Sequence, residues 1–329
     1  SFSTDIYEAY KYYLLKGNVF ISHLLQLLSC RFGKYQERSI WNVINPENQS
    51  NSIIWTKSIR LLTNDLYTKF HIKKPKNRKS IFEFWISQLR AVEQGVLKSD
   101  DSFVIQMPTS AGKTFIAEIA ILEGLIKFPT KKCIYIAPFR ALTNEKESEL
   151  SKNLSKLGYT VSSLSGAYEV DEFQNFILET TDVLIATPEK LDLLYRMQID
   201  YFKEVSLLVV DEGHIIGGSN ERAALLEFLI IRLKIKVKKL KILFISAVMP
   251  AINGKEFSLW VSNKDNNIIE SPIYIDDTVW QPTRKLVGKF KWVNKTTSQI
   301  TYPEENLAEN KNRARVIPFI TNLIQRKKI

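Results

Sequence analysis

Several residue types and patterns that would point to other classes of protein are scarce or absent in this chain. Only two cysteines occur in 329 residues, Cys30 and Cys133, and their separation fits no metal-binding spacing. The three histidines are too scattered along the chain to suggest a zinc site. No apolar run approaches 18 residues, which excludes a membrane-spanning helix. We therefore expect no membrane among the partners of this protein. Because so few cysteines favour a reducing compartment, we expect a cytoplasmic protein.

The rest of the composition is that of a globular chain with an excess of basic side chains. Apolar residues make up 45% and charged residues 25% of the sequence, and 329 residues suffice for two domains. The net charge is +11 and the isoelectric point is about 9.4. This balance favours a polyanionic partner, nucleic acid before a membrane surface, although lysines that only solubilise the chain would produce the same balance.

A rhythm of strands and helices begins near residue 102. The strand-like runs are almost uniformly apolar rather than alternating, as expected of parallel strands that are covered on both faces. The predicted strands are 102–107, 131–137, 160–164, 182–186, 206–210 and 241–247, with helices predicted at 114–127, 140–157 and 221–234. This order predicts an α/β fold, a doubly wound parallel sheet.

The two ends of the chain lack this rhythm. Residues 7–15, 19–28 and 53–70 have helical periodicity, so we expect a helical accessory region over 1–80, which ends in a basic, solvated linker at 71–80. The sheet domain is expected over 81–264. Beyond it, 273–275 and 285–293 are strand-like and 313–325 is helix-like. Residues 265–329 are therefore interpreted as a linker and the start of a second domain.

The run Met107-Pro-Thr-Ser-Ala-Gly-Lys-Thr114 joins a predicted strand to a predicted helix. The N–H groups of this loop and the N-terminus of the helix would point at one place, where they could bind the negative charges of a triphosphate. Lys113 would supply charge to the β- and γ-phosphates, and the Thr114 hydroxyl would ligate Mg²⁺. The cradle itself would comprise Pro108, Thr109, Ser110, Ala111 and Gly112. ATP and Mg²⁺ are thus the predicted cofactors, since a Gly-Lys-Thr occurring by chance would lack the flanking strand and helix.

Two carboxylates, Asp211 and Glu212, end a later apolar strand. Asp211 would hold the metal, and Glu212 would orient and deprotonate the attacking water. An acidic pair at a strand end is otherwise explained as a helix cap. The upstream phosphate loop favours the catalytic interpretation.

These residues resemble the motifs of a known family. The phosphate loop, Asp211-Glu-Gly-His214 and Ser246-Ala247-Val248 are similar to motifs I, II and III of superfamily 2 DExH-box helicases, and most similar in style to the superkiller-like branch. Gln88 resembles the Q-motif glutamine that reads adenine. Residues 137–146 and 186–190 resemble motifs Ia and Ib. The resemblance extends over 81–264 and implies that this segment is the first RecA-like motor domain.

The resemblance also implies which residues contact a nucleic-acid strand. They are Arg140, Thr143, Ser165, Gly166, Thr187, Pro188 and Lys190. The residues themselves agree in kind, because most of them follow a predicted parallel strand, where ligands of such sheets collect. Hydroxyls and cations suit phosphate contacts rather than base recognition. Capping and surface solvation remain alternatives for Arg140 and Lys190.

The resemblance further assigns His214, with Ser246 and Ala247, to the coupling of hydrolysis to strand movement. One residue departs from the family pattern, because Val248 stands where the motif has threonine and so lacks the hydroxyl. This departure favours an alternative function, a nucleotide-gated clamp or scaffold that binds nucleic acid without processive unwinding.

The leading hypothesis is an ATP-dependent helicase or translocase, of 3′–5′ type by the resemblance. It would act on single-stranded nucleic acid or a duplex with a single-stranded tail, with DNA favoured over RNA. Too few residues follow Val248 for a second RecA-like domain of roughly 150 residues. The chain is therefore expected to be the front part of a longer protein, whose rear part completes the ATP site.

The Asp-Glu-Gly-His box and the helical front region also resemble helicases of bacterial antiviral defence systems, such as the Hachiman type. DNA repair is the rival role. In the defence case an effector nuclease subunit could bind, with the N-terminal helices as a candidate contact.

Overall fold

The computed structural model describes residues 2–63, 80–108, 111–164, 172–216, 218, 220–247, 257–261, 273–276, 289–294, 297–302 and 315–320. The chain forms two compact units, Ser1–Trp280 and Gln281–Ile329. The division falls later than the boundary expected at 264, because a strand beyond that point pairs within the first sheet. The assignment of 265–329 to a second motor domain stays a prediction.

The first unit is built on a seven-stranded sheet in the order β3-β4-β2-β5-β6-β1-β7, in which every pair is parallel. The strands are β1 (Phe103–Gln106), β2 (Lys132–Ile136), β3 (Val161–Ser163), β4 (Val183–Ala186), β5 (Val205–Asp211), β6 (Lys241–Ser246) and β7 (Ile273–Asp276). The predicted parallel sheet is confirmed. Its central strands β1, β2, β4 and β5 are almost wholly buried, which explains their uniformly apolar sequences.

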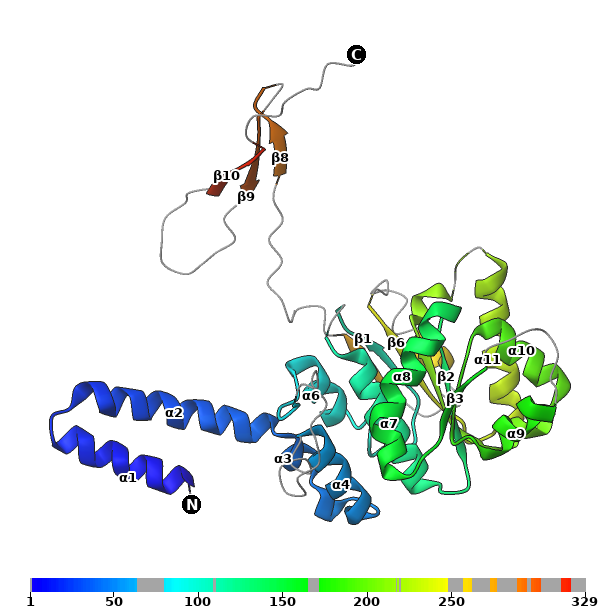
Figure 1. The fold of residues 1–329 in the computed structure, drawn as a ribbon, viewed down its shortest axis with the longest axis horizontal. Coiled ribbons are helices and arrows are strands. Elements are labelled where there is room, and N and C mark those ends of the chain that lie inside the picture. Colours follow the sequence, from blue (N-terminus) through cyan, green and yellow to red (C-terminus); the bar gives the residue numbers. More distant parts are fainter. Residues whose placement is uncertain are drawn as a thin grey trace. The chain divides into compact units, whose positions relative to one another are not determined.

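Helices cover both faces of this sheet (Figure 1). The helices α7 (Lys113–Lys127) and α8 (Arg140–Leu157) contribute to one apolar core. The other core contains side chains of α9 (Glu172–Thr180), α10 (Pro188–Met197) and α11 (Glu221–Lys236). Two short 3₁₀ helices, Ile199–Glu204 and Gly213–Ile215, flank β5. The doubly wound arrangement predicted from the sequence is therefore present.

The front of the chain is helical, as predicted. It comprises α1 (Phe2–Leu15), α2 (Val19–Arg38), α3 (Ile40–Ile44), a 3₁₀ turn at Pro46–Asn48, α4 (Ser52–Leu62) and α6 (Ile86–Glu93). Asn18 and Asn51 cap α2 and α4 by accepting hydrogen bonds from main-chain N–H groups three residues on. Residues 64–79, which include nearly all of the expected basic linker, lie outside the described residues.

Trp55 and Ile59 of α4 are fully buried in the same apolar core as α7. Helix α4 therefore shares packing with the sheet domain. Within the described ranges, no helix combines the length and apolarity needed to cross a bilayer.

The second unit contains a three-stranded antiparallel sheet of β8 (Lys289–Trp292), β9 (Ser298–Tyr302) and β10 (Arg315–Ile320), with β9 in the centre. The helix predicted over 313–325 is wrong, because its described part is strand β10. Pro318 has no N–H to donate and would break a helix, whereas an edge strand tolerates it. The β10–β9 register shifts at this proline.

Candidate ATP site and nucleic-acid pocket

The order of the strands brings the three predicted catalytic motifs to one edge of the sheet. Motif I follows β1, Asp211 ends β5 with Glu212 directly after it, and Ser246 ends β6. These three strands are neighbours in the order β5-β6-β1. The N–H of Met107 donates to the Ser246 carbonyl oxygen at 3.0 Å, which extends the ladder into the loop. Carboxyl ends of parallel strands share one edge, so segments distant in sequence become adjacent.

The phosphate loop is closed by Gly112, whose φ of +78° lies in the left-handed region. A Cβ at this position would come within 2.1 Å of Gln88 Nε2. The Gln88 amide donates to the carbonyl oxygens of Ala111 and Gly112 at 3.2 and 3.3 Å, and its Oε1 accepts from the Trp85 N–H at 2.9 Å. Gln88 thus supports the loop backbone, and adenine recognition by its side chain stays a prediction. Thr109 and Ser110 lie outside the described residues.

Asp211 is held by a tyrosine that the sequence analysis did not single out. The Tyr135 hydroxyl, from β2, donates to Asp211 Oδ2 at 2.7 Å, and Asp211 Oδ1 accepts from the Glu212 N–H at 3.0 Å. Burial, joined by the negative charge of Asp211, raises the pKa of Tyr135 well above its ordinary value. The phenol therefore stays protonated and orients the carboxylate. The sequence offered one signal for this role, a tyrosine hydroxyl in the apolar strand β2, which pairs with the strand that ends in Asp211.

Glu212 connects the phosphate loop to the histidine. It adopts φ +52°, a strained left-handed conformation for a residue with a side chain. Its carboxylate lies 3.3 Å from Lys113 Nζ and 3.2 Å from His214 Nδ1. His214 Nδ1 also lies 3.1 Å from Ser246 Oγ. Lys113, Glu212, His214 and Ser246 therefore form one continuous series of polar contacts across motifs I, II and III, and Ala247 follows directly.

Thr114 is contacted by a second lysine. Lys146, on α8, donates from Nζ to Thr114 Oγ1 at 2.6 Å and lies 3.0 Å from Glu149 Oε2. Lys146 is the last residue of the segment 137–146, which resembles motif Ia, and no role was predicted for it. Its contact with Thr114 depends on the packing of α8 on the sheet, which the sequence pattern does not show.

The glycine of the Asp-Glu-Gly-His box lies against an aromatic ring. A Cβ on Gly213 would come within 2.5 Å of Phe244 Cδ1. Phe244 is fully buried on β6, two residues before Ser246, and packs edge-on against Phe257 at a centroid distance of 4.7 Å. The size of the side chain at position 244 therefore explains why a glycine occupies position 213.

We expect Gly213→Ala to lower the free energy of unfolding by about 1–3 kcal/mol, because the ring cannot move without disturbing the core. In a Phe244→Leu background the same substitution should cost less than about 0.5 kcal/mol. Denaturant unfolding followed by tryptophan fluorescence measures both values, since Trp260 lies 6.4 Å from the Phe244 ring. Equal costs in the two backgrounds would contradict the clash.

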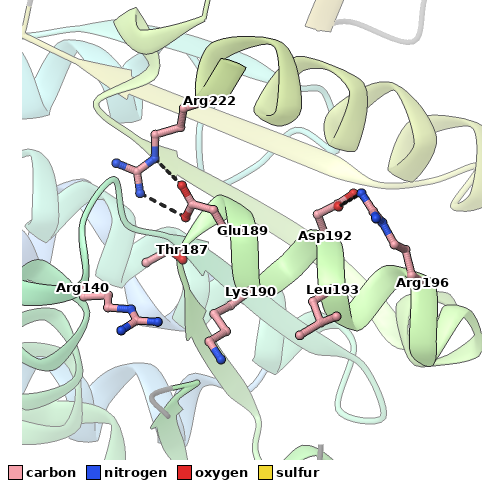
Figure 2. A pocket seen from close by; sticks show the side chains of 8 residues that line it. All are labelled: Arg140, Thr187, Glu189, Lys190, Asp192, Leu193, Arg196 and Arg222. Carbon is pink, nitrogen blue, oxygen red and sulfur yellow. Dashed lines mark hydrogen bonds and ion pairs between the residues drawn. The ribbon is translucent and has the colours of Figure 1, made fainter. Parts of the chain in front are cut away.

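A pocket of about 390 Å³ lies where α8 and α10 begin (Figure 2). It is lined by Arg140, Thr187, Glu189, Lys190, Asp192, Leu193, Arg196 and Arg222. Arg140 is the first residue of α8, and Pro188 opens α10, where a proline costs no hydrogen bond. The structure thus brings together three residues of the predicted nucleic-acid set, Arg140, Thr187 and Lys190.

Basic side chains outnumber acidic ones in the lining of this pocket. Both of its carboxylates are engaged by arginines: Glu189 by Arg222 at 2.6 and 3.0 Å, and Asp192 by Arg196 at 2.5 Å. In Figure 2 the side chains of Arg140 and Lys190 extend toward the same space. Partial burial, together with the charge of Arg140, lowers the pKa of Lys190. The positive charges of Arg140 and Lys190 repel each other, and an anion bound between them would relieve that repulsion.

The remaining members of the predicted nucleic-acid set do not line this pocket. Thr143 is 2% exposed, and its hydroxyl donates to the Arg140 carbonyl oxygen at 2.7 Å. Pro188 is buried at the start of α10. Ser165 and Gly166 lie outside the described residues. Contacts from these four residues to a nucleic-acid strand stay predictions.

A phosphate loop followed by a strand-end Asp-Glu pair on a parallel sheet defines a P-loop nucleotide-binding domain. The family model described as DEAD/DEAH box helicase matches residues 86–257. The chain belongs to the DEAD/DEAH box helicase family, and this membership implies an ATP-binding domain.

Similar proteins include a Hachiman protein and ATP-dependent DNA helicases. The chain is 35% identical to the Hachiman protein HamB of Bacillus cereus over 289 residues, which cover 87% of this chain and 24% of that protein. It is 36% identical to the ATP-dependent DNA helicase Hel308 of Pyrococcus horikoshii over 220 residues, 67% of this chain and 28% of that protein. The chain therefore spans about a quarter of the length of these relatives. A crystal structure of the DUF1998 helicase MrfA aligns with a TM-score of 0.47 at 19% identity, over 67% of this chain and 29% of that one.

Proposed function

We propose that this chain is the nucleotide-binding motor domain of an ATP-dependent DNA helicase or translocase. The observation that carries the proposal is the contact of Lys113 with Glu212 at 3.3 Å, which joins the phosphate loop to the strand-end carboxylates. The pocket that Arg140, Thr187 and Lys190 help to line supports the nucleic-acid part of the proposal, and it is called the basic pocket because its lining has four basic and two acidic side chains. A 3′–5′ direction is the expectation for this branch of the family.

The residues present fit an Mg²⁺-bound nucleotide. Hydroxyl and carboxylate oxygens, here of Thr114 and Asp211, are the hard ligands that Mg²⁺ prefers alongside phosphate oxygens. At Gly112 the absence of a side chain leaves room for the Gln88 amide, which supports the loop backbone whose N–H groups would bind phosphates. In this role Lys113 binds phosphate oxygens, Glu212 orients and deprotonates the attacking water, and Tyr135 keeps Asp211 aligned. The metal would neutralise charge that develops on the phosphates.

The proposed polymer is DNA, bound as a single strand or as the single-stranded tail of a duplex. The names of the Hel308 relatives, ATP-dependent DNA helicases, favour DNA over RNA. Arg140 and Lys190 would contact phosphates, which position a strand without recognising its bases. Thr143, Ser165, Gly166, Thr187 and Pro188 are retained as further proposed contacts.

The test is the ATPase rate of the full-length protein with no polymer, with single-stranded DNA and with single-stranded RNA of the same sequence. We expect DNA to stimulate hydrolysis by roughly tenfold or more, because the strand aligns the motor for closure. Equal rates in all three conditions would overturn the proposal, and stimulation by RNA alone would make the protein an RNA helicase. A strand-displacement assay then separates a helicase from a clamp, which would bind the tailed duplex and displace nothing.

The proposed biological role is antiviral defence in the cytoplasm, with DNA repair as the rival. The similarity to the Hachiman protein HamB, which covers 87% of this chain, supports the first role. An effector nuclease subunit would be the expected partner. The exposed apolar side chains of α1 and α2, such as Leu15 and Phe20, are candidates for its contact. Co-purification from the native host tests this, and a protein that elutes without a nuclease would contradict it.

A further inference from the structure

Helix α8 begins at the basic pocket and extends to the proposed ATP site. Arg140, its first residue, lines the basic pocket, and Lys146 contacts Thr114 of the phosphate loop. Six residues of α-helix separate these two side chains by roughly 9 Å along the axis. One rigid element therefore carries a proposed strand contact and a direct contact to the proposed metal ligand.

The contact of Lys146 is made at the oxygen that would bind the metal. Lys146 Nζ lies 2.6 Å from Thr114 Oγ1, and its side chain is 13% exposed. An Mg²⁺ ion binds an oxygen at about 2.1 Å. An ammonium and an Mg²⁺ ion on the same hydroxyl would then lie at most about 4.7 Å apart, where like charges repel strongly in a partly buried site.

Lys146 already has a second partner besides Thr114. Glu149, one turn further along α8, lies 3.0 Å from Lys146 Nζ and is 43% exposed. Its carboxylate can keep the ammonium when Thr114 no longer accepts from it, so leaving Thr114 does not strand a buried charge.

We propose that Lys146 and Mg²⁺ are mutually exclusive at Thr114 Oγ1, so that Lys146 gates metal entry and α8 transmits the exchange to Arg140. This inference rests on the proposed nucleotide-binding function. Lys146 acts here as a positioning residue. A metal entering with the nucleotide would displace the lysine from Thr114 and leave it on Glu149, which it already contacts, and α8 would carry this change to Arg140.

The test measures binding of a fluorescent ATP analogue to the full-length protein while Mg²⁺ is titrated, a readout that needs no hydrolysis. In Lys146→Gln we expect the half-saturating Mg²⁺ concentration to fall roughly five- to tenfold, because a competing cation is removed. Lys146→Arg keeps the charge and should resemble the wild type. Lys152→Gln removes the same charge from an exposed position on α8 and should also leave the Mg²⁺ requirement unchanged.

A second measurement addresses the link through α8. The affinity for single-stranded DNA, measured by fluorescence anisotropy, should respond to the Mg²⁺-bound analogue in the wild type and respond at least threefold less in Lys146→Gln. An unchanged or higher Mg²⁺ requirement in Lys146→Gln would overturn the gate, and an unchanged DNA response would overturn the link. A wild type that binds no nucleotide at any Mg²⁺ concentration would instead overturn the proposed function.

Discussion

Replacing Glu212 by glutamine is expected to reduce DNA-stimulated ATP hydrolysis by roughly 10²- to 10⁴-fold while nucleotide binding stays within about threefold of the wild type. Glutamine keeps the shape of the side chain and removes the base that accepts the proton of the attacking water. Lys113, which lies 3.3 Å from this carboxylate, would keep its contact with phosphate oxygens. The Glu212→Gln variant should therefore bind the nucleotide and fail to hydrolyse it efficiently.

Both quantities are measured on the full-length protein, hydrolysis by phosphate release under saturating DNA and binding with a fluorescent ATP analogue. Glu179→Gln is the matched control, because Glu179 is exposed on α9 and loses the same charge. Lys113→Ala, in contrast, should lose binding together with hydrolysis. A loss of less than about tenfold in Glu212→Gln would assign the base to another residue.

Combined replacement of Arg140 and Lys190 by alanine is expected to weaken binding of single-stranded DNA by roughly 10- to 100-fold at low salt. Each cation that contacts a phosphate of a single strand contributes about 0.7 to the slope of log affinity against log salt. Two lost contacts should therefore reduce the magnitude of that slope by about 1.4. Because these contacts are to phosphates, the loss should be similar for different base sequences.

The control for this prediction is the pair Lys238→Ala and Lys239→Ala. These lysines belong to a basic run that precedes β6, so they lie at the edge of the sheet opposite to the motifs. Their removal changes the net charge by the same amount and should change affinity by less than about threefold. If this pair instead carried the salt dependence, the strand path would follow the basic run and not the pocket.

The strands and helices of the motor domain were predictable because their signals are local. Buried parallel strands are uniformly apolar, and each motif follows directly after one of them. The error at β10 came from the same kind of reasoning, since the apolar residues around Pro318 suit a helical period in isolation. Pairing with β9, which no local pattern reports, makes this segment an edge strand.

The candidate site divides in a similar way. Lys113, Thr114, Asp211 and Glu212 were identified from sequence because their roles depend on residue type and spacing. Tyr135 was missed, because its role depends on a hydroxyl meeting Asp211 across two neighbouring strands. For Thr143 the residue type predicts a phosphate contact, and only the structure shows that its hydroxyl donates to the Arg140 carbonyl oxygen.

The sequence by itself determined the family, the parallel sheet and the edge on which the motifs gather, because these follow from apolar periodicity and from short motifs contiguous in the chain. Only the tertiary structure decided what each motif touches. Lys146 reaches Thr114 through the packing of α8 on the sheet, and Gly213 is required by the ring of Phe244. Such contacts join residues far apart in sequence, and their geometry is set by side-chain packing in a dense core.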